Sequence, residues 1–213
     1  MSLCGKIFQA YYKVILKREF FLKKIPKGFL ETKIIFTHIP KAAGISIAHS
    51  IYGEQVGHFP LNLYKNILGV EFDEYFKFTF VRHPYSRFES AYYFLKSGGC
   101  NSFDKYYSKL VLSKYLDIND FVANYLTEKT IYEYIHFFPQ SYFLEKDGKV
   151  LFDFLGYFEN LEGDFEKLEA QLNIKLNLGN KNVTKLKKDC QLNSESLNKI
   201  NILYSRDFEI LDY

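Results

Sequence analysis

The sequence predicts an α/β fold in which a central parallel sheet is flanked by helices. Three short apolar segments, at 33–38, 76–81 and 150–157, have the pattern of buried strands. Stretches with apolar residues at helical spacing lie between and after them. Strands that alternate with helices favour a parallel sheet, and such sheets bind ligands beyond the carboxyl ends of their strands.

The first strand, KIIFTH at 33–38, is followed by the turn IPKAAG at 39–44. A short helix is expected over 46–52, and Gly53 is expected to end it. The segment 57–72 is expected to be rich in loops, with one short helix at 63–68.

The second strand, FKFTFV at 76–81, leads into RHP at 82–84, and proline suits a first helical turn. The apolar residues that follow recur at helical spacing, at Phe88, Ala91, Tyr92 and Leu95. The sequence SGG at 97–99 is expected to end this helix.

The C-terminal half predicts further helices around the third strand. Residues 104–134 are expected to be mostly helical, with a break at 117–119. A helical face follows the strand at 161–172, a polar Asn/Lys-rich loop is expected over 173–189, and a final helix starts near Ser194. No linker or repeat divides the chain, so we expect a basic amphipathic segment at 1–30 and a single domain at 31–213.

Composition excludes several classes of protein. The chain has 213 residues, 47% of them hydrophobic, which suits one globular domain. A net charge of +3 mildly favours an anionic ligand, but no dense Lys/Arg stripe predicts a nucleic-acid partner. Three cysteines far apart argue against a disulfide framework or a zinc site. No apolar run approaches the ~20 residues of a membrane span, and no signal-peptide pattern is present, so we expect a cytoplasmic protein.

The segment from Lys6 to Lys24 mixes lysines with aromatic and aliphatic residues. A basic amphipathic helix of this kind can lie on an anionic membrane surface. The alternative is a helix packed on its own domain. The first reading predicts peripheral contact with the inner face of the membrane.

The stretch THIPKAAGIS at 37–46 has the pattern of an anion-binding turn. The backbone N–H groups at 42–46 would lie at a helix N-terminus, where the helix dipole favours negative charge. Lys41 adds a full positive charge, and small residues allow close approach. The lysine precedes the glycine, so this is not the G-x-x-x-x-G-K-[ST] loop of nucleotide triphosphatases. The alternative is an ordinary strand-to-helix turn.

The second stretch, FVRHPYSRFESAYYF, begins where the second strand ends. Arg82 leaves the strand, and Arg87 and Ser90 are three residues apart on the helix that follows. A guanidinium with a serine hydroxyl suits a phosphate group. Taken alone, the stretch also fits a surface helix with an ion-paired arginine.

Together, a lysine loop after one strand and Arg-x-Pro-x-x-Arg-x-x-Ser after the next resemble the sulfotransferase superfamily. The later stretches HFFPQSYFL and DFLGYFENLEGDFEKL are similar to its carbohydrate-type branch, family 2. The resemblance runs from about Thr37 to the C-terminus. It implies a P-loop-like, three-layer fold.

The resemblance also implies a reaction and a cofactor. A sulfuryl group would pass from 3′-phosphoadenosine 5′-phosphosulfate (PAPS) to a hydroxyl of a glycan or glycolipid, leaving PAP. No metal is required, because lysine, arginine and backbone amides can neutralise the cofactor. The implied cofactor-binding residues are Lys41, Ala42, Ala43, Gly44, Ile45 and Ser46 at the 5′-phosphosulfate, Arg82 and Ser90 at the 3′-phosphate, and Asn180 and Lys181 in a closing loop.

Two residues are the candidates for catalysis. Lys41 would stabilise the charge that develops on the oxygen bridging phosphate and sulfur. His58, in VGHFPLN, is similar in position to the base histidine of some carbohydrate sulfotransferases, and histidine suits proton removal near neutral pH. His136 and Gln140 would face the acceptor, or cap a helix end. Glutamates such as Glu54 and Glu89 remain alternative bases.

The sequence departs from the family pattern at Ala42 and Ile45, where hydroxyl residues are common, while Ser46 keeps one hydroxyl. This leaves open a degenerate PAP-binding module without turnover. A nucleotide-triphosphate-dependent kinase is a further alternative, which the missing G-K-[ST] loop disfavours. The residues identify neither the acceptor nor the oligomeric state.

Overall fold

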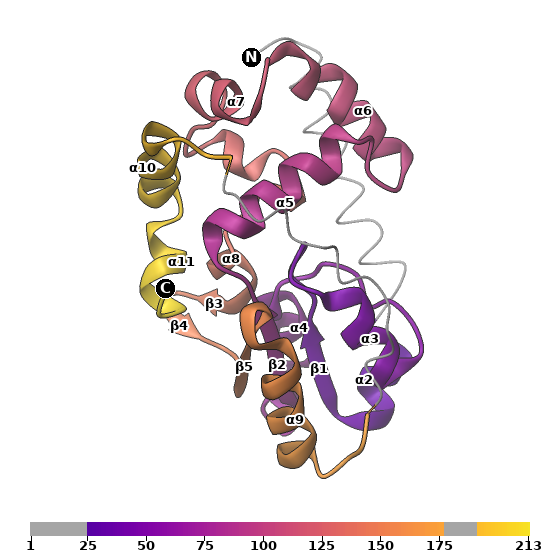
Figure 1. Cartoon of the computed structure of the whole chain (residues 1–213). Helices are drawn as coiled ribbons and strands as arrows, with labels where there is room; N and C mark the ends of the chain where they lie inside the picture. The colour runs from indigo at the N-terminus through magenta and orange to yellow at the C-terminus, as the bar shows by residue number, and fades with distance from the viewer. Residues whose placement is uncertain (1–24, 177–190) are drawn as a thin grey trace.

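The computed structural model describes residues 25–176 and 191–213 (Figure 1). The predicted amphipathic segment at 6–24, and Asn180 and Lys181 of the predicted closing loop, lie outside the described residues. The division of the chain at residue 30 stays a prediction.

The centre of the fold is a parallel sheet of three strands in the order β1-β2-β5. The strands are β1 (Ile34–Thr37), β2 (Phe76–Val81) and β5 (Phe154–Tyr157). The middle strand β2 is buried along almost its whole length, as expected for a parallel sheet covered on both faces. The predicted α/β architecture with a parallel sheet flanked by helices is confirmed.

The third strand is shorter than predicted, because residues 149 and 150 belong to a separate hairpin. In it, β3 (Glu145–Lys146) pairs with β4 (Lys149–Val150) in antiparallel register. The hairpin turn passes through Asp147 and Gly148, both with positive φ. The strand that joins the sheet therefore begins at Phe154.

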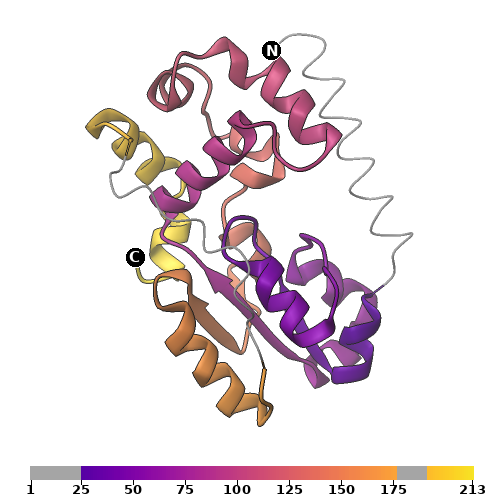
Figure 2. The ribbon, with the colours of Figure 1, turned by 45° about the vertical axis from the view of Figure 1, so that its right-hand side comes forward.

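Helices pack around the sheet: some connect β1 to β2, and others follow β5 (Figures 1 and 2). The predicted helix after the first turn is confirmed; it begins two residues earlier than expected and ends at Gly53, with φ 71°. The helix predicted over 161–172 is also confirmed, and it packs on β5. The elements between β1 and β2 are α3 (Gly44–Tyr52), α4 (Leu61–Leu68) and η1 (Gly69–Glu74), and those after β5 are η5 (Phe158–Asn160) and α9 (Leu161–Leu172); a short helix, α2 (Lys27–Thr32), precedes β1.

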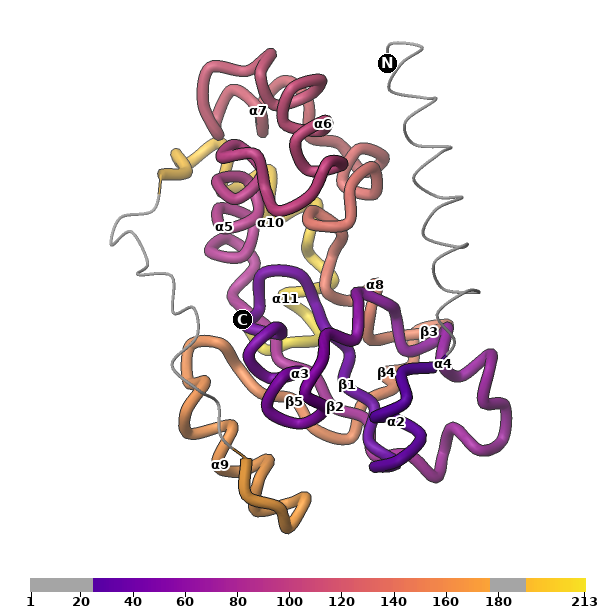
Figure 3. The backbone as a smooth tube through the Cα atoms, turned by 90° about the vertical axis from the view of Figure 1, so that its right-hand side faces the viewer, coloured from indigo at the N-terminus to yellow at the C-terminus, as the bar shows by residue number. Residues whose placement is uncertain are grey.

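A helical region, defined as residues 84–144, lies beyond the carboxyl end of β2 (Figure 3). Residues 104–134 do not form the long interrupted helix that was predicted. Short α-helices alternate with 3-10 turns, and Asp117 begins α7 by accepting the N–H groups of Asn119 (2.8 Å) and Asp120 (2.9 Å). The elements are α5 (Pro84–Lys96), α6 (Ser102–Leu110), η2 (Leu112–Lys114), α7 (Ile118–Asn124), η3 (Thr130–Tyr132), η4 (Ile135–Phe137) and α8 (Ser141–Leu144).

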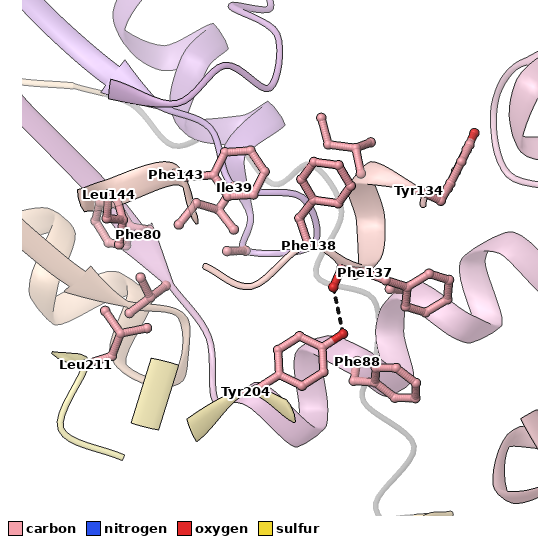
Figure 4. Close-up of a cluster of buried hydrophobic side chains, with 14 of the residues drawn as sticks. Ile39, Phe80, Phe88, Tyr134, Phe137, Phe138, Phe143, Leu144, Tyr204 and Leu211 are labelled. Atoms are coloured by element: carbon pink, nitrogen blue, oxygen red, sulfur yellow. Dashed lines mark hydrogen bonds between the residues drawn. The ribbon is translucent and has the colours of Figure 1, made fainter. Parts of the chain in front are cut away.

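The predicted final helix is two helices, α10 (Ser194–Leu203) and α11 (Ser205–Ile210), which pack on the helical region. Tyr204, between them, donates a hydrogen bond of 2.6 Å to the carbonyl of Phe137 (Figure 4). Its ring also lies against Phe88 of α5. This contact fixes the helical region against the C-terminal helices, and so fixes its position above the strand ends.

No helix in the described part of the chain combines the length and apolar character needed to cross a bilayer.

Candidate active site

The loop after β1 has a backbone shaped for an anion. Lys41 (φ 72°) and Ala43 (φ 61°) adopt the left-handed region, which non-glycine residues rarely occupy. Left-handed residues in a tight turn can direct backbone N–H groups toward a concavity, a geometry that binds anions. The N-cap residue of α3 is Ala43, which has no side-chain oxygen and makes no capping hydrogen bond to the first turn of the helix.

Close packing against His38 holds this loop in place. A Cβ atom added to Gly44 would lie 1.8 Å from the His38 ring, so only glycine fits. The His38 ring stacks on Phe36 of β1, with centroids 5.8 Å apart. Ala42 is only 1% exposed and packs into the core, and its N–H donates to the carbonyl of Ile39 (3.4 Å), so its side chain and its N–H are both engaged within the protein.

Lys41 extends from the loop toward the helical region. Its Nζ lies 3.8 Å from the centroid of the Phe94 ring on α5. Burial, and next the positive charge of Arg82, lower the pKa of Lys41, while Cys100 and Asp104 oppose this shift. The ammonium is therefore a readier donor than an ordinary surface lysine.

Arg82 joins the two predicted motifs in space. Its Nη1 donates to the carbonyl of Lys41 (3.3 Å), and its Nε donates to Ser86 Oγ (3.0 Å). The guanidinium lies over the Phe158 ring at 4.3 Å. Two of its five N–H donors thus have partners within the described residues, which leaves donors for a ligand.

Ser86 is a site residue that the sequence analysis missed. It lies four residues before Ser90, so both serines fall on one face of α5, and Ser90 is half-buried. The sequence carries a signal for this: Arg82, Ser86 and Ser90 are spaced four residues apart, the spacing that places residues on one face of a helix.

The neighbouring Arg87 faces the protein interior. It is 1% exposed, and it donates to the carbonyls of His136 (3.2 Å) and Phe138 (2.6 Å). These bonds brace the segment 136–138. The two arginines of the second motif therefore have different surroundings.

Gln140 has a structural role instead of the predicted contact with the acceptor. It is fully buried; its Oε1 accepts the N–H of Arg82 (3.0 Å), and its Nε2 donates to the carbonyl of Arg82 (2.7 Å). Asp207 of α11 in turn accepts the N–H groups of Gln140 and Ser141, both at 2.8 Å. The amide thus fixes the end of β2.

His58 is placed to accept a proton. Its Nδ1 lies 2.8 Å from the carbonyl of His38. Because a carbonyl only accepts, Nδ1 carries the hydrogen and Nε2 keeps its lone pair. Burial, and next the proximity of His136, lower the pKa of His58 to about 4, so the ring is neutral near pH 7.

His136 lies on the far side of His58, with ring centroids 6.1 Å apart. Its Nε2 is 3.5 Å from Oδ1 of Asp104, a fully buried carboxylate on α6. No motif marked Asp104 in the sequence, because it reaches the site from a distant helix. His38, His58, His136, Lys41 and Asp104 form one cluster, in which Asp104 supplies negative charge.

A protein-family model described as "Sulfotransferase family" matches residues 30–213. The chain belongs to the sulfotransferase family. The predicted family-2 assignment is confirmed, and sulfuryl transfer follows as the activity. This sulfotransferase is also 31% identical over 116 residues to an uncharacterized protein of Archaeoglobus fulgidus, covering 54% of this chain and 82% of the relative. No solved structure matches.

In this sulfotransferase the fold brings Lys41, Arg82, His58 and His136 to one end of the sheet. Their roles, and those of Ala43, Ile45, Ser46 and Ser90, stay predictions. Among the described residues, no group of three or more His, Cys, Asp or Glu side chains is arranged to hold a metal ion.

Proposed function

We propose that this sulfotransferase takes its sulfuryl group from PAPS and transfers it to a hydroxyl of a glycan or glycolipid. The observation that carries the proposal is the convergence of three features at the strand ends. The loop after β1, the Lys41 ammonium and the Arg82 guanidinium lie together, and Arg82 donates directly to the Lys41 carbonyl. Such a site favours a ligand with more than one anionic group.

The residues present fit PAPS. Its 5′-phosphosulfate would lie on the loop, where Ala43 has a left-handed backbone and is half-buried, and its 3′-phosphate would lie at Arg82 and the Ser86–Ser90 face. PAPS supplies a sulfuryl group attached to a phosphate leaving group. As in phosphoryl transfer, the protein contributes mainly positioning and charge stabilisation.

Two side chains would act on the reacting atoms. Lys41 would stabilise negative charge on the departing oxygen, and its lowered pKa strengthens it as a donor. Neutral His58 would accept the hydroxyl proton at Nε2, which the tautomer set by the His38 carbonyl leaves free. His58 is half-buried, so an acceptor can approach it from solution.

The glycan or glycolipid acceptor rests on the resemblance to carbohydrate-type enzymes. A place at the inner membrane face rests on the basic segment at 6–24. Deleting residues 1–24 and measuring binding to anionic liposomes tests that part separately. If the deletion leaves liposome binding unchanged, the proposed membrane contact is wrong.

The experiment for the reaction is transfer of radiolabelled sulfate from PAPS to a panel of neutral and uronate-containing oligosaccharides. The wild type should label at least one acceptor, and Lys41→Met should not. Binding of PAP without any transfer would favour the degenerate module suggested by Ala42 and Ile45. A preference for ATP with magnesium would favour a kinase.

A further inference from the structure

We propose that Asp104 and His136 form a buried proton-accepting pair behind His58. In this pair Asp104 positions His136, and His136 takes over the proton that His58 removes from the acceptor hydroxyl. The inference rests on the proposed function, and it concerns residues that no motif singled out for this role.

The surroundings of Asp104 are built around its carboxylate. Oδ1 accepts the hydroxyl of Tyr134 (2.5 Å) and faces Nε2 of His136, and Oδ2 accepts the N–H of Cys100 (2.9 Å). A Cβ atom on Gly99 would lie 2.1 Å from Cβ of Asp104, so the loop closes tightly over the side chain. Burial acts to raise the pKa of Asp104, but hydrogen bonds from His136, Tyr134 and Cys100 outweigh it and hold the pKa well below its usual value. The group is a carboxylate.

The orientation of His136 leaves one nitrogen unused. With Nε2–H directed at the carboxylate, Nδ1 carries a lone pair. His136 is only 8% exposed, and within the described residues Nδ1 is buried without a hydrogen-bond partner. Leaving such an atom unsatisfied costs free energy, so it calls for an explanation. A proton-accepting role supplies one.

The charges around His136 explain why the carboxylate is needed. Burial lowers the pKa of His136 and Asp104 raises it, while Lys41 and Arg87 lower it. The neighbouring His58 and the Tyr134 ring add no negative charge at neutral pH. Among these groups, only Asp104 stabilises the protonated, positively charged form of the His136 ring.

His58 lacks such a partner, because its Nδ1–H donates to a neutral carbonyl. The two histidines therefore divide the task. Half-buried His58 meets the acceptor, and buried His136 lies behind it with its ring 6.1 Å away, edge to face. Because of that geometry, transfer between them requires a ring to turn or a water molecule to bridge.

The proton balance is simple. The acceptor O–H bond breaks as its oxygen bonds to sulfur, and the bond from sulfur to the bridging oxygen breaks with its electron pair leaving on the phosphate. The proton moves to Nε2 of His58 and then to Nδ1 of His136, where Asp104 balances the charge. It is released to solvent afterwards, and nothing is oxidised or reduced.

The first test is the pH–rate profile of Asp104→Asn, measured as sulfate release from radiolabelled PAPS with water as the acceptor. The plateau rate should fall on the order of 10²-fold, because the proton acceptor is weakened. The acid limb should move to lower pH, because the anion that raises the pKa of both histidines is gone. His136→Gln keeps a donor toward Asp104 but no base, and should show the same loss of rate.

Asp164→Asn is the matched control. Asp164 is also a buried carboxylate in the first turn of a helix, and it accepts the N–H of Tyr157 (2.8 Å), but it lies on α9, away from the cluster. This variant should lose stability without moving the acid limb. An Asp104→Asn enzyme that binds PAP and has an unshifted limb would overturn the inference.

A second readout does not depend on turnover. The ¹⁵N spectrum of the histidine rings should show His136 as the Nε2–H tautomer in the wild type, and this tautomer should lose its predominance in Asp104→Asn. If His136 of the wild type is instead the Nδ1–H tautomer, the proposed Asp104–His136 pair is wrong. A wild type that binds PAP but transfers sulfate to no acceptor, water included, would instead overturn the proposed function, and the proton-accepting role with it.

Discussion

The strand ends and the helical region contribute opposite kinds of group to the site. The strand ends supply Lys41, Arg82 and the N-terminus of α3, all of which favour an anion. The helical region supplies Asp104 and His136, a carboxylate and an imidazole. His58 lies between them, bonded to the first region through His38 and packed against the second.

This difference separates two tasks. Binding an anionic donor requires cations and N–H groups that are held without an ion-pair partner. Moving a proton requires a base and a group that stabilises its charged form. Substitutions in the two regions should therefore impair different measurable properties of the enzyme.

The largest effect is expected at Lys41. Lys41→Met should lower kcat on the order of 10²–10³-fold, because charge on the departing oxygen loses its stabilising donor. The folded state should be little affected, since within the described residues the ammonium lies over the Phe94 ring and forms no salt bridge. Steady-state kinetics and thermal unfolding of the same preparation check this. A variant within tenfold of wild-type kcat would remove Lys41 from the reaction.

Arg87→Met should act on stability rather than on PAP binding. It removes two charged hydrogen bonds to buried carbonyls, each contributing about 1.5–3 kcal/mol. Urea unfolding measures the loss, and Arg206→Met, on a partly exposed ion pair with Glu145, is the control with a smaller effect. If Arg87→Met keeps wild-type stability but loses PAP binding, Arg87 binds the nucleotide as Arg82 is proposed to do.

Gly44→Ala tests the packing that holds the anion loop. The new Cβ would overlap the His38 ring, and overpacking of this kind costs about 1–3 kcal/mol. Gly53→Ala is the matched control, because its Cβ meets nothing within 4 Å and only the left-handed φ is strained. Thermal unfolding should rank Gly44→Ala as the more damaging change, with weakened PAP binding. Equal effects would mean that His38 does not fix the loop.

Acid should destabilise the protein through the three histidines of the cluster. Burial lowers the pKa of His38, His58 and His136 from 6.5, so the unfolded chain binds more protons than the folded chain below that pH. Their contribution to stability is complete above about pH 6.5 and is lost as pH falls toward 4. Urea unfolding across this window should show the decline, and His58→Gln should flatten part of it. A free energy of unfolding that rises on acidification would contradict the account.

The two regions also differ in how far the sequence predicted them. The strands, Gly53 and the Lys41 and Arg82 motifs were predictable, because each depends on neighbours within about ten residues. Asp104 was not, because its role comes from contacts with Tyr134 and His136, thirty residues away. For Gln140 and Arg87, the residue types fitted ligand binding, and burial gave them structural partners instead.

The central claim is that the strand ends bind the 3′-phosphorylated nucleotide of a sulfuryl donor. The measurement is the shift in thermal unfolding with PAP, ADP and ATP–magnesium, for the wild type and Arg82→Ala. A ligand at a hundred times its Kd adds about 2.7 kcal/mol of stability. The account predicts stabilisation by PAP over the other two, lost in Arg82→Ala. Equal stabilisation by ADP, preference for ATP–magnesium, or an unchanged response in Arg82→Ala would contradict it.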